Sequence, residues 1–148
     1  MITAPMAGTN RLLVIEDNPA DVVLLRRALA TAGLDCHLTV IDDGADAMHF
    51  LRNDGSAATP DLAIVDLNLP KHGGFEIIER MSANPQFAAV PVVILSSSFS
   101  LRDRAQMEKF RVRRYIVKPA GLDEYMAIGW QIRELLADGR ARQPHSGT

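Results

Sequence analysis

The sequence has little of what several common protein classes need. Cys36 is its only cysteine, so no intrachain disulfide can form and no zinc site built from several cysteines is possible. No apolar run approaches the roughly 18 residues of a membrane span. The segment 1–5 has neither the basic part nor the continuous apolar part of a signal peptide. We therefore expect a soluble cytoplasmic protein with no membrane contact.

An excess of positive charge is also missing. Lys and Arg number 16 against 18 Asp and Glu, which gives a formal net charge of −2. No large basic field is available to hold nucleic acid, so we expect no such partner. A length of 148 residues suits one domain with a full core. We expect this domain at 11–137, between a flexible N-terminus at 1–10 and a flexible tail at 138–148.

What the chain does have is an alternation of short apolar segments with amphipathic ones. We expect strands at 11–15, 36–41, 62–65, 92–95 and 115–117. We expect helices at 19–32, 45–53, 75–83, 101–111 and 122–137. This alternation predicts an α/β fold, a parallel sheet with helices on both faces. Right-handed crossovers then bring the carboxyl ends of all the strands to one edge of the sheet.

Polar residues follow four of the expected strands at that edge. They are Glu16 and Asp17, Asp66, Ser96, and Lys118. Taken singly, each has an ordinary structural explanation as a helix cap, a turn former or a solvated charge. Taken together, they predict an acidic pocket that Mg²⁺ would relieve of its charge repulsion. With a lysine and a hydroxyl opposite, the pocket would suit a phosphoryl group, which Asp66 could accept as an acyl phosphate.

These pieces, in this order, carry a family resemblance. The matching stretches are Glu16-Asp17, the loop 66–70 (Asp-Leu-Asn-Leu-Pro), Ser96, and the run 115–119 (Tyr-Ile-Val-Lys-Pro). On them the chain from about Arg11 to Ala137 resembles the receiver domain of two-component response regulators. The resemblance implies a single-domain, doubly wound flavodoxin-like (βα)₅ fold with strand order 2-1-3-4-5.

The resemblance also implies a role for each position. Asp66 would be the phosphoacceptor, Ser96 and Tyr115 the switch residues, and Lys118 the phosphate-binding lysine. The Mg²⁺ ligands would be Glu16, Asp17, Asp66 and the backbone carbonyl of Asn68.

Three finer features belong to the same resemblance. The Lys118–Pro119 bond would be cis. Asn68 and Ser98 would flank the route by which water reaches the phosphoryl group. Because neither is a ready general base, we expect slow to intermediate self-dephosphorylation. Ala120 stands where many receivers carry Phe, and with the loops after the first and third strands it makes the chain look like the standalone regulators paired with bacterial phytochrome kinases.

The implied function is a phosphorylation-activated switch and not an enzyme. A sensor histidine kinase, a bacterial phytochrome by the finer resemblance, would phosphorylate Asp66. With no output domain expected after Ala137, the switch would signal by docking. We expect a homodimer or kinase contact on the fourth helix, fifth strand and fifth helix, where Arg113, Tyr125 and Trp130 lie.

Two alternatives stay open at this point. A Mg²⁺-dependent hydrolase of the haloacid dehalogenase type would also use Asp66 as its nucleophile. Such an enzyme usually has a second acid two residues further on, where this chain has Asn68, which cannot donate and recover a proton. A scaffold receiver that is never phosphorylated is the other alternative.

Overall fold

A computed structural model describes residues 9–52, 58–69, 73–97 and 100–142, and structural statements below concern these residues. The strands form one parallel sheet in the order β2-β1-β3-β4-β5, as predicted. They are β1 (Asn10–Ile15), β2 (Cys36–Ile41), β3 (Leu62–Val65), β4 (Val92–Ser96) and β5 (Arg114–Val117). The helices are α1 (Pro19–Thr31), α2 (Gly44–Phe50), α3 (Gly74–Ala83), α4 (Leu101–Lys109) and α5 (Leu122–Arg142).

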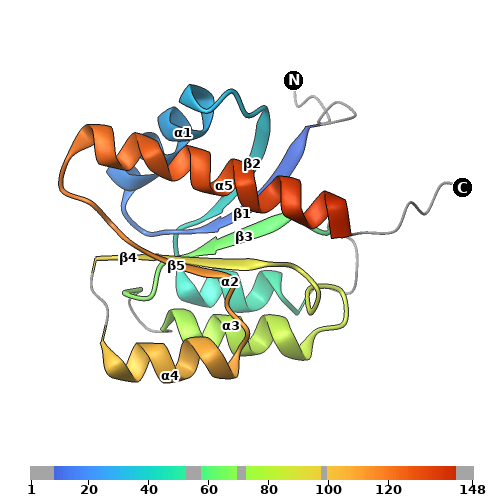
Figure 1. Ribbon diagram of the computed structural model, residues 1–148. Helices are drawn as coiled ribbons and strands as arrows, with labels where there is room; N and C mark the ends of the chain where they lie inside the picture. The colour runs from blue at the N-terminus through green and yellow to red at the C-terminus, as the bar shows by residue number, and fades with distance from the viewer. Residues whose placement is uncertain (1–8, 53–57, 70–72, 98–99, 143–148) are drawn as a thin grey trace, which may run out of the picture.

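The helices cover both faces of the sheet. Figure 1 shows α1 and α5 on one face and α2, α3 and α4 on the other. β3 lies in the middle, and all four of its residues are buried. Leu62 and Ile64 pack toward α1 and α5, whereas Ala63 and Val65 pack into the opposite core, as the alternation of a strand requires. The apolar run that ends at Asp66 is therefore a strand buried on both faces.

The contact between α1 and α5 is close because α5 carries a glycine there. A Cβ at Gly129 would collide with the carbonyl oxygen of Ala28 on α1. One turn later Arg133 Nη1 donates a hydrogen bond of 2.6 Å to the carbonyl oxygen of Ala32, just past the end of α1. The interior glycine, which costs helix stability by itself, is thus explained by packing.

Local signals mark the helix ends as the sequence indicates. The Asn18 side chain accepts a hydrogen bond of 3.0 Å from the backbone N–H of Ala20 and caps α1. Gly33 follows α1 with a φ of 73°, which an L side chain rarely adopts. Ser100 and Asp103 form a reciprocal capping box at the start of α4.

Three expectations about the chain's course are corrected. α5 continues to Arg142, five residues beyond the expected end at Ala137, so part of the segment 138–148 is helical. Asn10, placed in the N-terminal segment 1–10, is the first residue of β1. The Lys118–Pro119 bond is trans, because the described residues contain no cis peptide bond. The cis prediction is wrong, and its premise fails too: a trans bond already lets the lysine side chain turn back toward Asp66.

Among the residues that the structure describes, no helix has both the length and the apolar character needed to cross a membrane.

Candidate functional site

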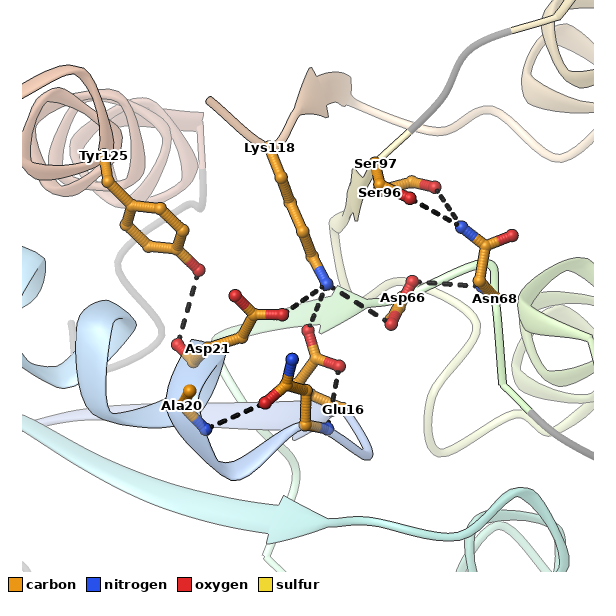
Figure 2. Close-up of polar contacts among 10 residues, drawn as sticks. Glu16, Ala20, Asp21, Asp66, Asn68, Ser96, Ser97, Lys118 and Tyr125 are labelled. Carbon is orange, nitrogen blue, oxygen red and sulfur yellow. Dashed lines mark hydrogen bonds and ion pairs between the residues drawn. The ribbon is translucent and has the colours of Figure 1, made fainter. Parts of the chain in front are cut away.

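The sheet places three of the predicted site residues side by side at one edge. Each lies one residue past its strand and is held there by one more hydrogen bond of the sheet. The N–H of Glu16 donates to the carbonyl of Ile41, that of Asp66 to Ile15, and that of Lys118 to Ser96, at 3.0, 3.0 and 2.7 Å. Because β1, β3 and β5 fix these backbones, the side chains meet although they come from distant parts of the sequence (Figure 2).

The Lys118 side chain is the centre of the site. Its Nζ lies 2.7 Å from Glu16 Oε1, 2.8 Å from Asp21 Oδ2 and 3.4 Å from Asp66 Oδ2. An ammonium group has three donors, and here each points at a carboxylate. Burial alone would lower the pKa of Lys118, but the hydrogen bonds that it donates to Asp21 and Glu16, together with the nearby negative charges, raise its pKa above the usual value. The lysine therefore stays charged.

Asp21 is a site residue that the sequence analysis did not identify. The pattern suggested only an acid at the positive end of a helix. In the structure Asp21 stands at the third position of α1, where a capping box would turn it back toward the cap. Instead it pairs with Lys118. An acid one turn after the Glu16-Asp17 pair is the sequence signal that could have indicated this contact.

Tyr125 supports this arrangement from α5. Its side chain is 2% exposed, and its hydroxyl donates a hydrogen bond of 3.3 Å to the backbone carbonyl of Asp21. Burial raises the pKa of Tyr125 well above its usual value. The residue is therefore part of the core and fixes the start of α1, so it does not belong to an exposed docking face.

The acids at the site exceed the cations. Glu16 is buried, and burial raises the pKa of its carboxyl to about 7, although the hydrogen bond from Lys118 opposes the shift. Glu16, Asp17 and Asp66 each offer an oxygen, and these oxygens all lie within 4.8 Å of one another. Asp17 is exposed, so the cluster opens to solvent. Three carboxylates at this spacing fit a hard divalent cation such as Mg²⁺.

Asn68 links Asp66 to the end of β4. Its backbone N–H donates a hydrogen bond of 3.0 Å to Asp66 Oδ1. Its side-chain Nδ2 donates to Ser96 Oγ and Ser97 Oγ, both at 3.2 Å (Figure 2). Ser97 is a second partner that the sequence did not indicate, since only Ser96 and Ser98 of this run were assigned roles. Ser98, predicted to flank the route of water, lies outside the described residues.

Ser96 and Tyr115, the predicted switch residues, lie on the neighbouring strands β4 and β5. Ser96 is buried, and Tyr115 is partly buried against the core. The Tyr115 hydroxyl makes a long hydrogen bond of 3.5 Å to Asp103 Oδ2 on α4. Burial is the main reason that the pKa of Tyr115 is raised. A tyrosine that bonds α4 from β5 can sense changes at either element.

Gly74 lets α3 start against the Asp66 loop. A Cβ at this position would lie 2.6 Å from the carbonyl oxygen of Asp66 and 2.8 Å from Leu67 Cα. The absence of a side chain at Gly74 thus allows a close backbone contact, which holds the backbone after Asp66 in place.

Comparison with known proteins agrees with this geometry. The sequence family described as the response regulator receiver domain matches residues 12–128. The chain belongs to this family. Receiver domains are phosphoacceptor signalling modules, so the resemblance stated from the motifs is confirmed at the level of family and fold.

Individual receivers are similar over most of their length. Response regulator Rcp1 of Synechocystis sp. is 34% identical over 116 residues, which cover 76% of this chain and 79% of Rcp1. Among solved structures, the phosphorylated cyanobacterial phytochrome response regulator RcpA matches with a TM-score of 0.78 and 34% identity, over 87% of this chain and 94% of RcpA. The Mn²⁺-bound form of Rcp1 matches with a TM-score of 0.75 and 31% identity, over 84% and 92%.

Proposed function

We propose that this receiver domain accepts a phosphoryl group on Asp66 from a sensor histidine kinase and signals by docking. The observation that carries the assignment is the position of the Asp66 carboxylate. It is buried, it lies 3.4 Å from the Lys118 ammonium, and it shares an acidic cluster with Glu16 and Asp17. Family membership supplies the class of reaction.

In the proposed reaction an Asp66 oxygen attacks the phosphorus of a phosphohistidine. A P–O bond forms as the P–N bond breaks, and the leaving histidine nitrogen keeps the electron pair and takes up a proton. Lys118 offsets the charge on the phosphoryl oxygens, and Asp21 and Glu16 fix the direction of its third donor. Hydrolysis later breaks the bond between phosphorus and Asp66, which restores the carboxylate and releases inorganic phosphate.

The proposed cofactor is Mg²⁺, held by Glu16, Asp17, Asp66 and the Asn68 carbonyl. The raised pKa of Glu16 and the three converging carboxylates support this set. When bound, the ion would supply positive charge for the phosphoryl oxygens and orient them for in-line transfer. The relative whose solved structure is described as Mn²⁺-bound supports a divalent cation in this family.

The proposed switch runs from Ser96 to Tyr115. The Ser96 hydroxyl would turn to a phosphoryl group on Asp66, and Tyr115, whose hydroxyl already interacts with both Ser96 and Asp103, would follow Ser96 inward and give up its contact with Asp103. Loss of that contact would loosen α4 from β5. We place the homodimer or kinase contact on the face of α4, β5 and α5, where a hollow of about 480 Å³ is lined by Met107, Tyr115, Val117 and arginines.

The sides of α5 differ in what they offer this docking face. Arg114 donates to Gln131 and pairs with Glu134, so this side of α5 borders β5. Trp130 is 52% exposed, and its ring lies beside Arg133, whose guanidinium donates a hydrogen bond to Ala32 just after α1. Trp130 is therefore on the side of α5 toward α1, whereas Arg113 lines the hollow on the proposed docking face. Arg113 is for this reason the better probe of the proposed interface. The proposed kinase is a phytochrome, because RcpA is described as a phytochrome response regulator.

The test is incubation with a small phosphodonor and Mg²⁺, followed by intact mass and peptide mapping. One persistent phosphoryl adduct on Asp66 is the expected result. Consumption of the donor without an adduct would indicate a hydrolase, and neither outcome would indicate a scaffold. Sedimentation of the wild type and of Arg113→Glu, with and without a phosphoryl mimic, tests the dimer. Self-association that is unchanged in all samples would move the interface elsewhere.

A further inference from the structure

A second cavity lies at the end of the sheet opposite to Asp66. Its volume is about 510 Å³, and it is enclosed by the end of α3, the segment leading into β4, and the turn from α4 to β5. In Figure 1 this is the end of the molecule where α3 and α4 both finish. The apolar part of its lining includes Ile78, Met81, Phe87, Val90 and Phe110. The volume lies within the range of small-molecule sites, about 300–1,000 Å³.

The charged residues of this cavity all have one sign. Lys109, Arg111 and Arg113 line it, and no Asp or Glu does. Within the described part of the chain, none of the three forms an ion pair. Lys109 Nζ lies 5.2 Å from the centre of the Phe110 ring, so one cation is already held over the apolar lining. Three cations without a counter-charge, around a hollow whose lining is partly apolar, favour an anion that also has an apolar part.

The backbone at Arg111 gives an independent reason to ask what its side chain does. Its φ is 55°, the left-handed conformation, and Arg111 is the one residue other than glycine with positive φ among the described residues. The turn closes with hydrogen bonds from Arg111 N–H to Glu108 and from Val112 N–H to Met107, at 3.3 and 3.1 Å. At the equivalent point after α1 the chain uses Gly33. The turn itself therefore favours glycine, and an arginine there indicates a use for the guanidinium.

We propose that this cavity binds a small organic anion, a carboxylate or phosphate attached to a flat apolar group. The apolar group would lie against Phe110, Pro91 and Ala88, which keep exposed apolar surface in the lining, and the anionic group would meet Arg111 and its two neighbouring cations. An inorganic anion would leave the apolar lining unused, and an uncharged ligand would leave the cations unpaired. The site shares no residue with the Asp66 cluster, so the inference stands apart from the proposed phosphorylation.

The experiment uses 1-naphthoate as the probe and amide chemical shifts of the full chain as the readout. 1-Naphthalenemethanol and acetate, which lack the charge and the apolar group respectively, are the two comparison ligands. We expect saturable shifts at residues 87–92 and 109–113 with 1-naphthoate, and much weaker ones with either comparison ligand. Absence of saturable shifts at these residues with 1-naphthoate would overturn the proposal.

Two variants locate the site, and one serves as a control. Arg111→Gly removes the guanidinium while giving the turn its preferred residue, so the fold is not weakened. We expect it to reduce affinity about tenfold, and Lys109→Gln to act in the same direction. Arg102→Gln, at the other end of α4, should bind as the wild type does. Equal affinity of all three variants for 1-naphthoate would refute the site. If a glutamate-rich peptide binds more tightly than 1-naphthoate, the ligand is an acidic protein segment and the small-anion proposal is wrong.

Discussion

At the carboxyl end of the sheet three acids pair with one lysine and a fourth, Asp17, lies beside two of them, whereas at the amino end three cations line a cavity without an acid. The three paired acids follow β1, lie on α1 and follow β3, and they meet Lys118 across the fold. The cations come from one short stretch, 109–113, around the turn after α4. The first imbalance is assembled by topology, because parallel strands end at the same edge. The second is assembled by local sequence.

At both ends, an unbalanced charge inside or beside a cavity predicts the sign of the charge on the ligand that binds there. At the acidic end the imbalance is visible as the pKa of Glu16, which burial raises to about 7. That end fits a divalent cation and then a phosphoryl group, whose charges offset each other. At the basic end the guanidinium of Arg111 is held by a backbone that glycine would occupy more easily. That end fits an anion.

The largest expected effect comes from removing the proposed nucleophile. Asp66→Asn keeps the shape of the side chain but cannot form an acyl phosphate, so we expect complete loss of the phosphoryl adduct. Asp42→Asn is the matched control, because Asp42 follows β2 as Asp66 follows β3 but is exposed. Intact mass after incubation with a phosphodonor is the measurement. An adduct that remains in Asp66→Asn and maps to the loop after β3 would falsify the assignment.

The acidic imbalance predicts a pH dependence of stability in the metal-free protein. Burial raises the Glu16 pKa from 4.5 to about 7, so between these values the folded state binds more protons than the unfolded state. The stability that protonation of Glu16 contributes is therefore fully present below about pH 4.5 and is lost as the pH rises through about 7. At about 1.4 kcal/mol per pKa unit the loss is on the order of 3 kcal/mol.

Urea unfolding of wild type and Glu16→Gln at pH 5 and pH 8, with a chelator present, measures this loss. The glutamine variant has no charge to bury, so the difference between the two proteins isolates Glu16. If Mg²⁺ binds the folded state at this cluster as proposed, it should restore stability to the wild type at pH 8. The idea fails if both proteins lose the same stability between the two pH values.

Asp21 should have a smaller effect, exerted through Lys118. In Asp21→Asn the ammonium loses a charged partner at 2.8 Å, so its third donor is held less firmly toward Asp66. We expect phosphorylation by a small donor to slow about tenfold, the loss expected for one charge-assisted hydrogen bond. Asp46→Asn is the control, because Asp46 is an exposed acid in the first turn of α2.

A second readout separates positioning from a general loss of structure. Since the hydrogen bond that Lys118 donates to Asp21 raises the pKa of the lysine, this pKa should fall in Asp21→Asn and stay unchanged in Asp46→Asn. Nitrogen-15 NMR of the Lys118 Nζ follows this directly. If the pKa of Lys118 is unaltered in Asp21→Asn, Asp21 does not position the lysine and acts only as an acid at the start of α1.

Most of the fold could be predicted from the sequence because its signals are periodic and local. The run 62–65 is apolar throughout and forms the central strand, and Asn18 and Gly33 bound α1 as their chemistry requires. The order of the strands came from the resemblance, and the structure agrees with it. The meeting of Glu16, Asp66 and Lys118 followed from the rule that parallel strands end together.

What the sequence did not show depends on side-chain direction and on contacts between distant helices. From the sequence, Asp21 is predicted only to be an acid at the start of a helix. Its contact with Lys118 is visible only in the fold, which brings α1 next to the end of β5. Tyr125 reads equally well as a core residue or a docking residue, and only packing under α1 decides for the core. The trans bond before Pro119 was missed because the family expectation outweighed the usual preference of such bonds. The extension of α5 to Arg142 was not predicted because the apolar periodicity of this helix is weak.

The smallest effect concerns the two left-handed turns, after α1 and after α4. Gly33 has a φ of 73° and Arg111 a φ of 55°, so glycine suits both. We expect Arg111→Gly to raise the free energy of unfolding by about 1 kcal/mol, because a side chain in this conformation costs about that much. Arg111→Ala keeps the Cβ and should leave stability near the wild-type value. Gly33→Ala should lower it, since a Cβ there would also lie 3.3 Å from Arg133 Nη1.

Thermal and urea unfolding of the three variants gives the ranking. If Arg111→Gly is the most stable and binds 1-naphthoate least, stability has been exchanged for an anion site at this turn. If Arg111→Gly and Arg111→Ala are equally stable, the left-handed backbone carries no cost here. The arginine would then need no functional explanation, and the contrast between the two ends of the sheet would rest on the unpaired cations alone.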